Sequence, residues 1–167
     1  MKFKWLIIAV YLFFSCTKEE SIMLEQDILE TPDWTKPTHG NIDNPNFSIV
    51  FPENFVNRID IEINSENWEK IQTDLEENSG SSQGPGQSPG SSAFDPVWVP
   101  CDVYFNGIQW YKVGIRYKGN SSLNSTYRAG IKKLPLKLDF DQFEDIWPAI
   151  QNQRFYGFKQ LSLKNNF

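Results

Sequence analysis

The sequence predicts an α+β domain made mainly of antiparallel β-strands with at least one helix. Three observations favour this class. Apolar and polar residues alternate in several short segments, an Asn-Gly pair separates two of them, and one segment has helical spacing instead. Short turns between strands, with a helix packed on the sheet, give a common layered architecture. We expect the folded unit to span residues 57–167.

The first expected elements are a strand and a helix. Isoleucine occupies every second position of RIDIEI, residues 58–63, which is typical of a half-buried strand. Asn64 or Ser65 can then cap a helix, because their side-chain oxygens accept the free N–H groups of its first turn. Three large apolar residues fall on one stripe of that helix and are expected in the core: Trp68, Ile71 and Leu75.

A β-hairpin follows. Residues 97–105 alternate again and lead to Asn106 and Gly107, a pair that tolerates the positive φ angles of a two-residue turn. Residues 108–118 return as the partner strand. Because Pro100 cannot donate a hydrogen bond to a neighbouring strand, the first strand is expected to lie at an edge or to contain a bulge. Cys101 alternates with valines, which indicates a buried, unreactive thiol.

Three further elements complete the expected order. KLPLKLDF, residues 133–140, has the spacing of another strand, and its Pro135 again favours an edge or a bulge. Residues 141–153 are expected to form a short helix interrupted by Pro148. FKQLSLKNNF, residues 158–167, reads as the last strand.

The N-terminus has the pattern of an export signal. Lys2 and Lys4 precede an apolar run over residues 5–14, which is shorter than the about 20 residues that span a bilayer as a helix. The serine-cysteine pair at its end resembles a bacterial lipobox, which implies a signal peptide over residues 1–15 and acylation of Cys16. The acids that follow are similar to the surface-export signal of lipoproteins in the Bacteroidetes group. We expect a bacterial lipoprotein in the outer membrane or at the cell surface; the alternative is an ordinary signal peptide.

Two segments have compositions typical of flexible chain. Residues 16–56 contain four prolines among acids and asparagines, without a sustained period, and are expected to form a tether. Residues 78–92 consist mostly of serine, glycine and proline, and are expected to form a surface insertion in the folded unit.

Charge is distributed unevenly along the chain. The formal net charge is −5, and it becomes −7 when Lys2 and Lys4 leave with the signal peptide. Residues 16–78 hold 15 acids and 4 bases, whereas residues 95–167 hold 6 acids and 10 bases. The basic half therefore permits an anionic ligand, although scattered solvated lysines would give the same count. We expect no nucleic-acid polymer as a partner. A single histidine, His39, argues against a Ser/His/Asp triad or a Cys/His zinc site.

The strand end VGIRYKGNSS, residues 113–122, has the chemistry of a phosphate contact. A bound phosphate needs cations, hydrogen-bond donors and a glycine that lets the backbone approach. Arg116 and Lys118 share one strand face, and Gly119 is followed by three small polar residues: Asn120, Ser121 and Ser122. The stretch is neither a Walker loop nor a kinase glycine-rich loop. A solvated strand face followed by a polar turn is the alternative.

Four blocks, in this order and spacing, resemble the start of the CotH-type family of atypical secreted protein kinases, named for a spore coat protein. They are RIDIEINSENWEKI, VPCDVYFNGIQWYKVGIRYKGNSS, GIKKLPLKLDFDQF and YGFKQLSLKNNF. The resemblance implies a remote protein-kinase-like fold whose β-rich N-terminal part helps enclose ATP with Mg²⁺, for phosphate transfer to protein serine or threonine. The family pattern continues beyond KNNF, so its metal-binding and catalytic aspartates have no matching positions. We therefore expect no catalytic residue in this chain, and an incomplete kinase domain that is inactive alone.

The resemblance also suggests roles for individual residues. Arg116 and Lys118 would contact phosphate charges, Gly119 would allow close backbone approach, and Asn120, Ser121 and Ser122 would donate hydrogen bonds. Two lysines from other matching blocks are second-rank candidates: Lys137 and Lys164.

Two alternatives remain open. The acids Asp139, Asp141, Glu144 and Asp145 begin with the spacing of a Ca²⁺ loop. However, Phe143 takes the next ligand position and the loop glycine is missing, which favours a solvated strand end. The chain could also be a non-catalytic surface module that binds a glycan or a protein through Trp98 and Tyr104.

Overall fold

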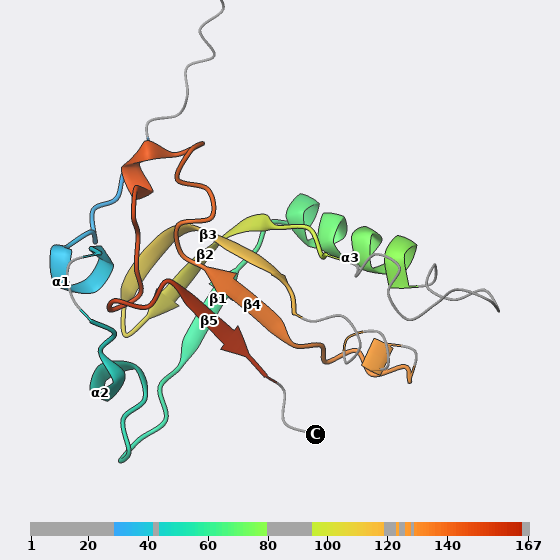
Figure 1. Cartoon of the computed structure of the whole chain (residues 1–167), viewed down its shortest axis with the longest axis horizontal. Helices are drawn as coiled ribbons and strands as arrows, with labels where there is room; N and C mark the ends of the chain where they lie inside the picture. The colour runs from blue at the N-terminus through green and yellow to red at the C-terminus, as the bar shows by residue number, and fades with distance from the viewer. Residues whose placement is uncertain are drawn as a thin grey trace, which may run out of the picture.

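A five-stranded antiparallel sheet organises the protein. The computed structural model describes residues 29–41, 44–79, 95–118, 123, 126–127 and 129–164. The strands are β1 Ile59–Glu62, β2 Val99–Phe105, β3 Ile108–Tyr117, β4 Leu136–Asp139 and β5 Gln160–Leu163. The helices are α1 Lys36–His39, α2 Phe47–Val50, α3 Ser65–Ser79 and the 3₁₀ helix η1 Pro148–Ile150. Each strand pairs with the next one along the chain, in the spatial order β1-β2-β3-β4-β5 (Figure 1). The α+β expectation is confirmed.

The β2–β3 hairpin forms at the expected turn. Asn106 and Gly107 have φ angles of 53° and 80°, which suit a two-residue turn that matches the twist of the strands. The register shifts between Cys101 and Val103, next to Pro100, so the bulge prediction is confirmed. The edge alternative is wrong, since β2 lies between β1 and β3.

Helix α3 covers one face of the sheet. Asn64 caps the helix by accepting the backbone N–H of Asn67 at 2.7 Å. Ile71 and Leu75 are each 1 % exposed and share a core with Val99 of β2. Burying such a side chain contributes about 1.5–3 kcal/mol, so the stripe fixes the helix to the sheet.

Trp68 differs from expectation. Its spacing on α3 predicts a core position, yet its side chain is 45 % exposed. The helical period predicts that Trp68 faces the sheet, but it does not predict whether other residues cover its side chain. In the structure Trp68 lines an open groove together with Tyr117 and Leu134.

An aromatic cluster fills the other end of the core. The Phe155 ring lies 4.6 Å from that of Trp110, 5.0 Å from that of Phe105 and 5.1 Å from that of Phe140, measured between ring centroids. All four residues are at most 1 % exposed. The cluster therefore packs the β2–β3 hairpin against Phe140 and Phe155, which lie between β4 and β5.

The folded unit begins earlier than the sequence suggests. Residues 29–41 and 44–50 lie inside the predicted tether, but they pack on the domain. His39 is fully buried, and its carbonyl accepts the backbone N–H of Arg154 at 2.7 Å. Asn46 donates its N–H to the carbonyl of Tyr156 at 2.8 Å. Figure 1 shows α1 and α2 beside the sheet. The tether prediction is therefore wrong for this part. Its aromatic side chains pack on rings of the folded unit, as His39 does on Trp110 and Phe47 on Phe158.

The remaining expectations are met in part. Residues 141–146 form turns and Pro148 begins the 3₁₀ helix η1, so turns and one short 3₁₀ helix replace the expected α-helix. A residue before proline is pushed out of the helical region, and Trp147 has φ −121° and ψ 88°. Cys101 is 4 % exposed, and burial raises the pKa of its thiol, as expected for an unreactive cysteine. In the part of the chain that the structure describes, no helix is long and apolar enough to cross a membrane.

Candidate functional site

The candidate cations lie on the sheet face that points away from α3. Tyr117 points toward α3, since the Gln72 amide of that helix donates to its hydroxyl. Side chains alternate along a strand, so Arg116 and Lys118 point to the opposite face. Arg116 pairs directly with Lys137 of β4, and Lys137 pairs with Ser162 of β5. Predicted residues from two separate blocks are thus neighbours on one face, beside Ser162 of a third block.

Arg116 is held by an acid and an indole. Its guanidinium forms an ion pair with Asp95 and lies 4.5 Å from the ring centroid of Trp98. The Arg116 side chain is 18 % exposed, whereas that of Asp95 is 82 % exposed. An ion pair with so exposed an acid contributes little in water, about 0–1 kcal/mol. An incoming anion could replace Asp95 at small cost.

Two lysines extend the basic face. The Lys137 ammonium lies 5.9 Å from the Trp98 ring centroid, so Trp98 contacts two cations. Lys118 Nζ donates to the Ser162 hydroxyl at 3.0 Å. Neither lysine makes an ion pair with any residue that the structure describes. Lys164 follows β5 and is exposed. We define the basic face by Arg116, Lys118 and Lys137.

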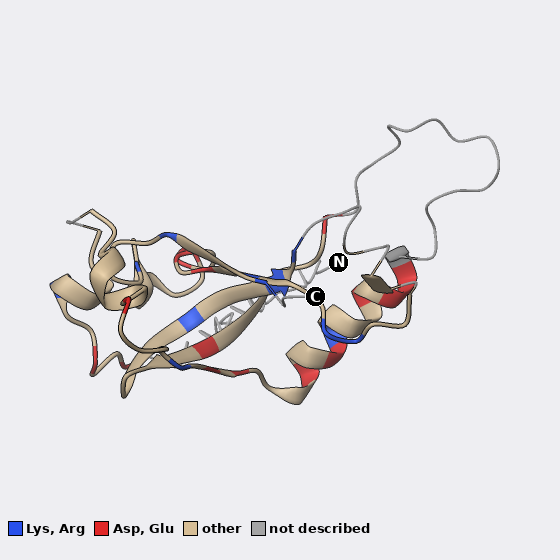
Figure 2. Cartoon of the chain, turned by 90° about the horizontal axis from the view of Figure 1, so that it is seen from below, with Lys and Arg blue, Asp and Glu red and all other residues tan. Residues whose placement is uncertain are grey.

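The sheet separates the basic face from the acidic helix α3. Helix α3 carries five acids and one lysine, Lys70, and lies on the other side of the sheet (Figure 2). An anion is therefore favoured on the basic face and disfavoured at the acids of α3, whereas Lys132 and Lys133 line the groove between that helix and the sheet.

Several predicted residues cannot be placed. Gly119, Asn120, Ser121 and Ser122 lie outside the described residues, and so does the lipidation candidate Cys16. The same holds for residues 80–92 of the predicted insertion, whereas α3 extends to Ser79. The glycine and hydroxyl half of the phosphate prediction stays a prediction.

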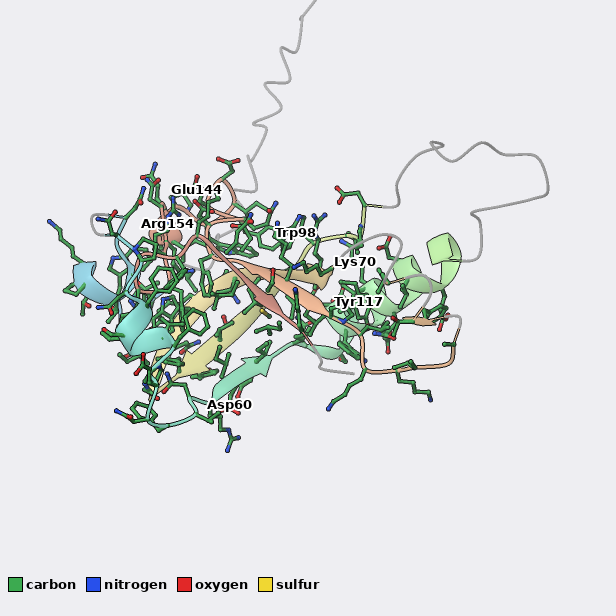
Figure 3. The ribbon with its side chains drawn as sticks, turned by 60° about the horizontal axis from the view of Figure 1, so that its bottom comes forward. Asp60, Lys70, Trp98, Tyr117, Glu144 and Arg154 are labelled. Carbon is green, nitrogen blue, oxygen red and sulfur yellow. The ribbon has the colours of Figure 1, made fainter. Side chains whose placement is uncertain are left out.

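A groove lies on the α3 side of the sheet. One cavity of about 570 Å³ is lined by Trp68, Gln72, Tyr117 and Tyr127, among others, and a second of about 280 Å³ adds Leu136 and Leu163. Both share Trp68 and Tyr117, which makes them parts of one groove. Figure 3 shows Tyr117 at the end of the molecule that holds α3, whereas Arg154 lies at the opposite end. The groove and the basic face are on opposite sides of the sheet.

Two of the four acids that were expected to be solvated are buried in the structure. Asp139 and Asp141 are 4 % and 6 % exposed, so the solvated reading is wrong for them. Asp141 forms ion pairs with Arg154 at 2.5 Å and Lys159 at 3.1 Å, and Gln160 donates to Asp139. These partners lie in the chain after η1, where sequence periodicity gives no signal.

Glu144 accepts the backbone N–H of Asn152 at 2.6 Å, which is a structural role. Asp145 is exposed, as expected. No cluster of three or more possible metal ligands occurs among the described residues.

The two buried carboxyl groups titrate in opposite directions. Burial raises the pKa of Asp139, and its hydrogen bond to Asp141 raises it further. Burial alone would raise the pKa of Asp141, but hydrogen bonds from Asp139, Arg154 and Lys159 lower it overall. When the pair holds one proton, the opposite shifts place it on Asp139, which donates it to an ionised Asp141.

We expect Asp139→Asn to stabilise the protein at neutral pH by about 1 kcal/mol, the size of a typical single-residue effect. The pKa of Asp139 is higher in the folded state than in the unfolded state, so its stabilising effect is lost as pH rises through the folded value. Asparagine keeps an N–H donor toward Asp141 without titrating. Guanidinium unfolding at about pH 5 and pH 7.5 should show a flatter pH dependence for the variant. A variant less stable than the natural chain at pH 7.5 would contradict this assignment.

Comparison of the chain with protein-family models, curated proteins and solved structures gives no match in any of the three.

Proposed function

We propose that this protein is a membrane-attached bacterial lipoprotein, acylated at Cys16, whose residues 57–167 form the N-terminal part of a CotH-type kinase domain. In complete form such a domain would transfer phosphate from ATP to protein serine or threonine hydroxyls. The present residues would supply one phosphate-contacting wall and no catalytic group. The observation that carries the proposal is the cross-strand pairing of Arg116 with Lys137 on a sheet face opposite the acidic helix α3.

The basic face suits the oxygens of a polyphosphate. Lys118 and Lys137 have no acidic partner among the described residues. Arg116 has one there, the exposed Asp95, and also donates to the carbonyl of Pro96 at 3.3 Å. Arginine can contact two phosphate oxygens at once, whereas lysine acts as a point charge. Together they would neutralise and orient the phosphates, which is a large part of what a protein contributes to phosphoryl transfer.

Mg²⁺ fits the described residues less well than phosphate does. The buried Asp139 and Asp141 are occupied by Arg154, Lys159 and Gln160, and no cluster of possible ligands is present in the described ranges. The metal would therefore enter with the nucleotide, and we assign it no ligand in this chain.

Lys137→Met should weaken binding of ATP with Mg²⁺ at least about tenfold, because a hydrogen bond to a charged group contributes about 1.5–3 kcal/mol. Methionine keeps much of the apolar stem, so the contact with Trp98 is partly preserved. Lys118→Met should act in the same direction. Isothermal titration calorimetry of the whole chain measures the dissociation constants.

Lys112→Met is the matched control. Lys112 is on the same strand, but its ammonium lies 5.6 Å from the Trp147 ring, outside the basic face. The proposal fails if the natural chain does not bind the nucleotide at millimolar concentration, or if Lys112→Met weakens binding as much as Lys137→Met.

A non-catalytic binding module is the second candidate. Trp98, one of its expected contact residues, is covered by Arg116 and Lys137, and Tyr104 is half-buried on β2. The groove beside α3 supports this candidate better, because it combines the exposed Trp68 with Tyr117 and mixed polar groups. Binding to soluble glycans that Trp68→Ala abolishes, without any effect of nucleotide, would favour it.

A further inference from the structure

His39 is enclosed by aromatic rings. Its side chain is fully buried, with ring centroids 5.0 Å from Trp34 and 4.6 Å from Trp110. Tyr111 stacks at 6.3 Å. A charged imidazolium would lose its hydration in this position, and burial accordingly lowers the pKa of His39.

Both imidazole nitrogens have partners that suit the neutral ring. Nε2 lies 2.9 Å from the carbonyl oxygen of Gln109, an obligate acceptor, so Nε2 carries the hydrogen. Nδ1 lies 2.6 Å from the Thr38 hydroxyl, which donates to it when the ring is neutral. Protonation of Nδ1 would reverse this bond and turn the hydroxyl hydrogen toward the Thr35 carbonyl, 3.2 Å away.

Few charged groups compensate a proton on His39. Asp33, on the same segment, raises the pKa of His39 somewhat, but its carboxylate already accepts the N–H of Gln109 at 3.0 Å. From the other packed elements, β3 contributes the neutral Tyr111. Arg154 contacts His39 through its backbone N–H, while its guanidinium binds Asp141.

Backbone hydrogen bonds attach residues 31–41 to the rest of the domain. Asp33 donates its N–H to the Tyr111 hydroxyl at 3.0 Å, and Tyr156 donates its N–H to the Thr38 carbonyl at 2.9 Å. His39 lies between these contacts and supplies the only ring of the segment that is fully buried among the described residues. We propose that His39 is an acid-sensitive latch, whose protonation releases residues 31–41 from β3 and from the turn at residues 153–158.

The direction of the effect follows from proton binding. A released His39 takes up a proton with the ordinary pKa of about 6.5, whereas the latched ring resists it. The latched state is therefore fully favoured above this pH and loses stability as pH falls below it. Between about pH 7.5 and 5.5 the equilibrium constant for release rises up to about tenfold.

Hydrogen exchange in the whole chain tests the latch. After correction for intrinsic exchange rates, amide protection in residues 31–41 should fall up to about tenfold between pH 7.5 and 5.5. Protection of β3 should stay constant except at Gln109, whose N–H donates to Asp33 of the released segment. His39→Gln is the matched variant, because its amide can donate to Gln109 and accept from Thr38 without titrating. Its protection in residues 31–41 should not depend on pH. The same pH dependence in His39→Gln as in the natural chain would overturn the proposal.

The natural chain provides an independent readout if the variant does not fold. His39 is the one histidine of the sequence, so its ring proton signals in an NMR titration are unambiguous. The latch requires that ring protonation and loss of protection occur at the same pH. Protonation of His39 while residues 31–41 remain protected would refute it, as would titration at the ordinary pKa without any release.

Discussion

Arg154→Met should lower the free energy of unfolding by about 3–5 kcal/mol at neutral pH, because it leaves a buried carboxylate without its main partner. The side chains of Arg154 and Asp141 are 10 % and 4 % exposed, and they meet at 2.5 Å. Asp141 would retain Lys159, whose side chain is 56 % exposed and screened by water. Methionine fills much of the arginine stem's volume, so the loss measures the charge more than the packing.

Guanidinium unfolding of the natural chain and the variant gives this difference. Arg58→Met is the matched control, because Arg58 forms an ion pair with Asp60 in which the two side chains are 85 % and 48 % exposed. A pair of this kind contributes about 0.2–1 kcal/mol. Equal losses in the two variants would show that the Arg154 pair is solvated in solution.

The Arg154 variant should also change the response to acid. The pKa of Asp141 is lower in the folded state than in the unfolded state, so its contribution is present above the unfolded value and is lost as pH falls through the folded one. Arg154→Met removes one of the hydrogen bonds that lower this pKa. The difference in stability between the two proteins should therefore shrink as the medium becomes strongly acidic.

The strands could be predicted because their signals are local. The alternating isoleucines of β1 and the Asn106-Gly107 turn specify pairing within a few residues of sequence. The cations of the basic face could be nominated as well. Their register, with Arg116 opposite Lys137, depends on the β3–β4 pairing, which composition does not give.

Contacts between distant parts of the chain account for what sequence reasoning missed. Gln109 donates to Asp33, 76 residues away, and this contact helps to fold a segment whose composition resembles a linker. Gln153 is fully buried because its amide donates to the carbonyls of Tyr111 and Phe140, at 2.9 Å each. A glutamine in a polar run carries no periodic signal for such a role. Polar residues that are buried by long-range hydrogen bonds cannot be recognised from local pattern alone.

Trp110→Ala should cost about 3–5 kcal/mol of unfolding free energy, the range for removing a large buried aromatic side chain. Trp110 is fully buried, stacks on His39 at 4.6 Å and contacts Phe155 at 4.6 Å. Its indole N–H donates to the carbonyl of Arg154 at 2.9 Å, so the substitution also leaves a buried acceptor unpaired. Because the substitution removes the ring on which His39 stacks, amide protection in residues 31–41 should fall even at neutral pH.

Trp68→Ala is the control, because it makes the same substitution at a partly exposed position. Trp68 is 45 % exposed, and its removal should cost about 1 kcal/mol, since it buries less surface and leaves no large internal cavity. Denaturation followed by far-ultraviolet circular dichroism avoids the altered tryptophan emission of both variants. If Trp110→Ala is no more destabilising than Trp68→Ala, the aromatic cluster does not organise this end of the core. If Trp110→Ala is destabilising but residues 31–41 keep their protection, the segment is held without the ring stack on which the latch depends.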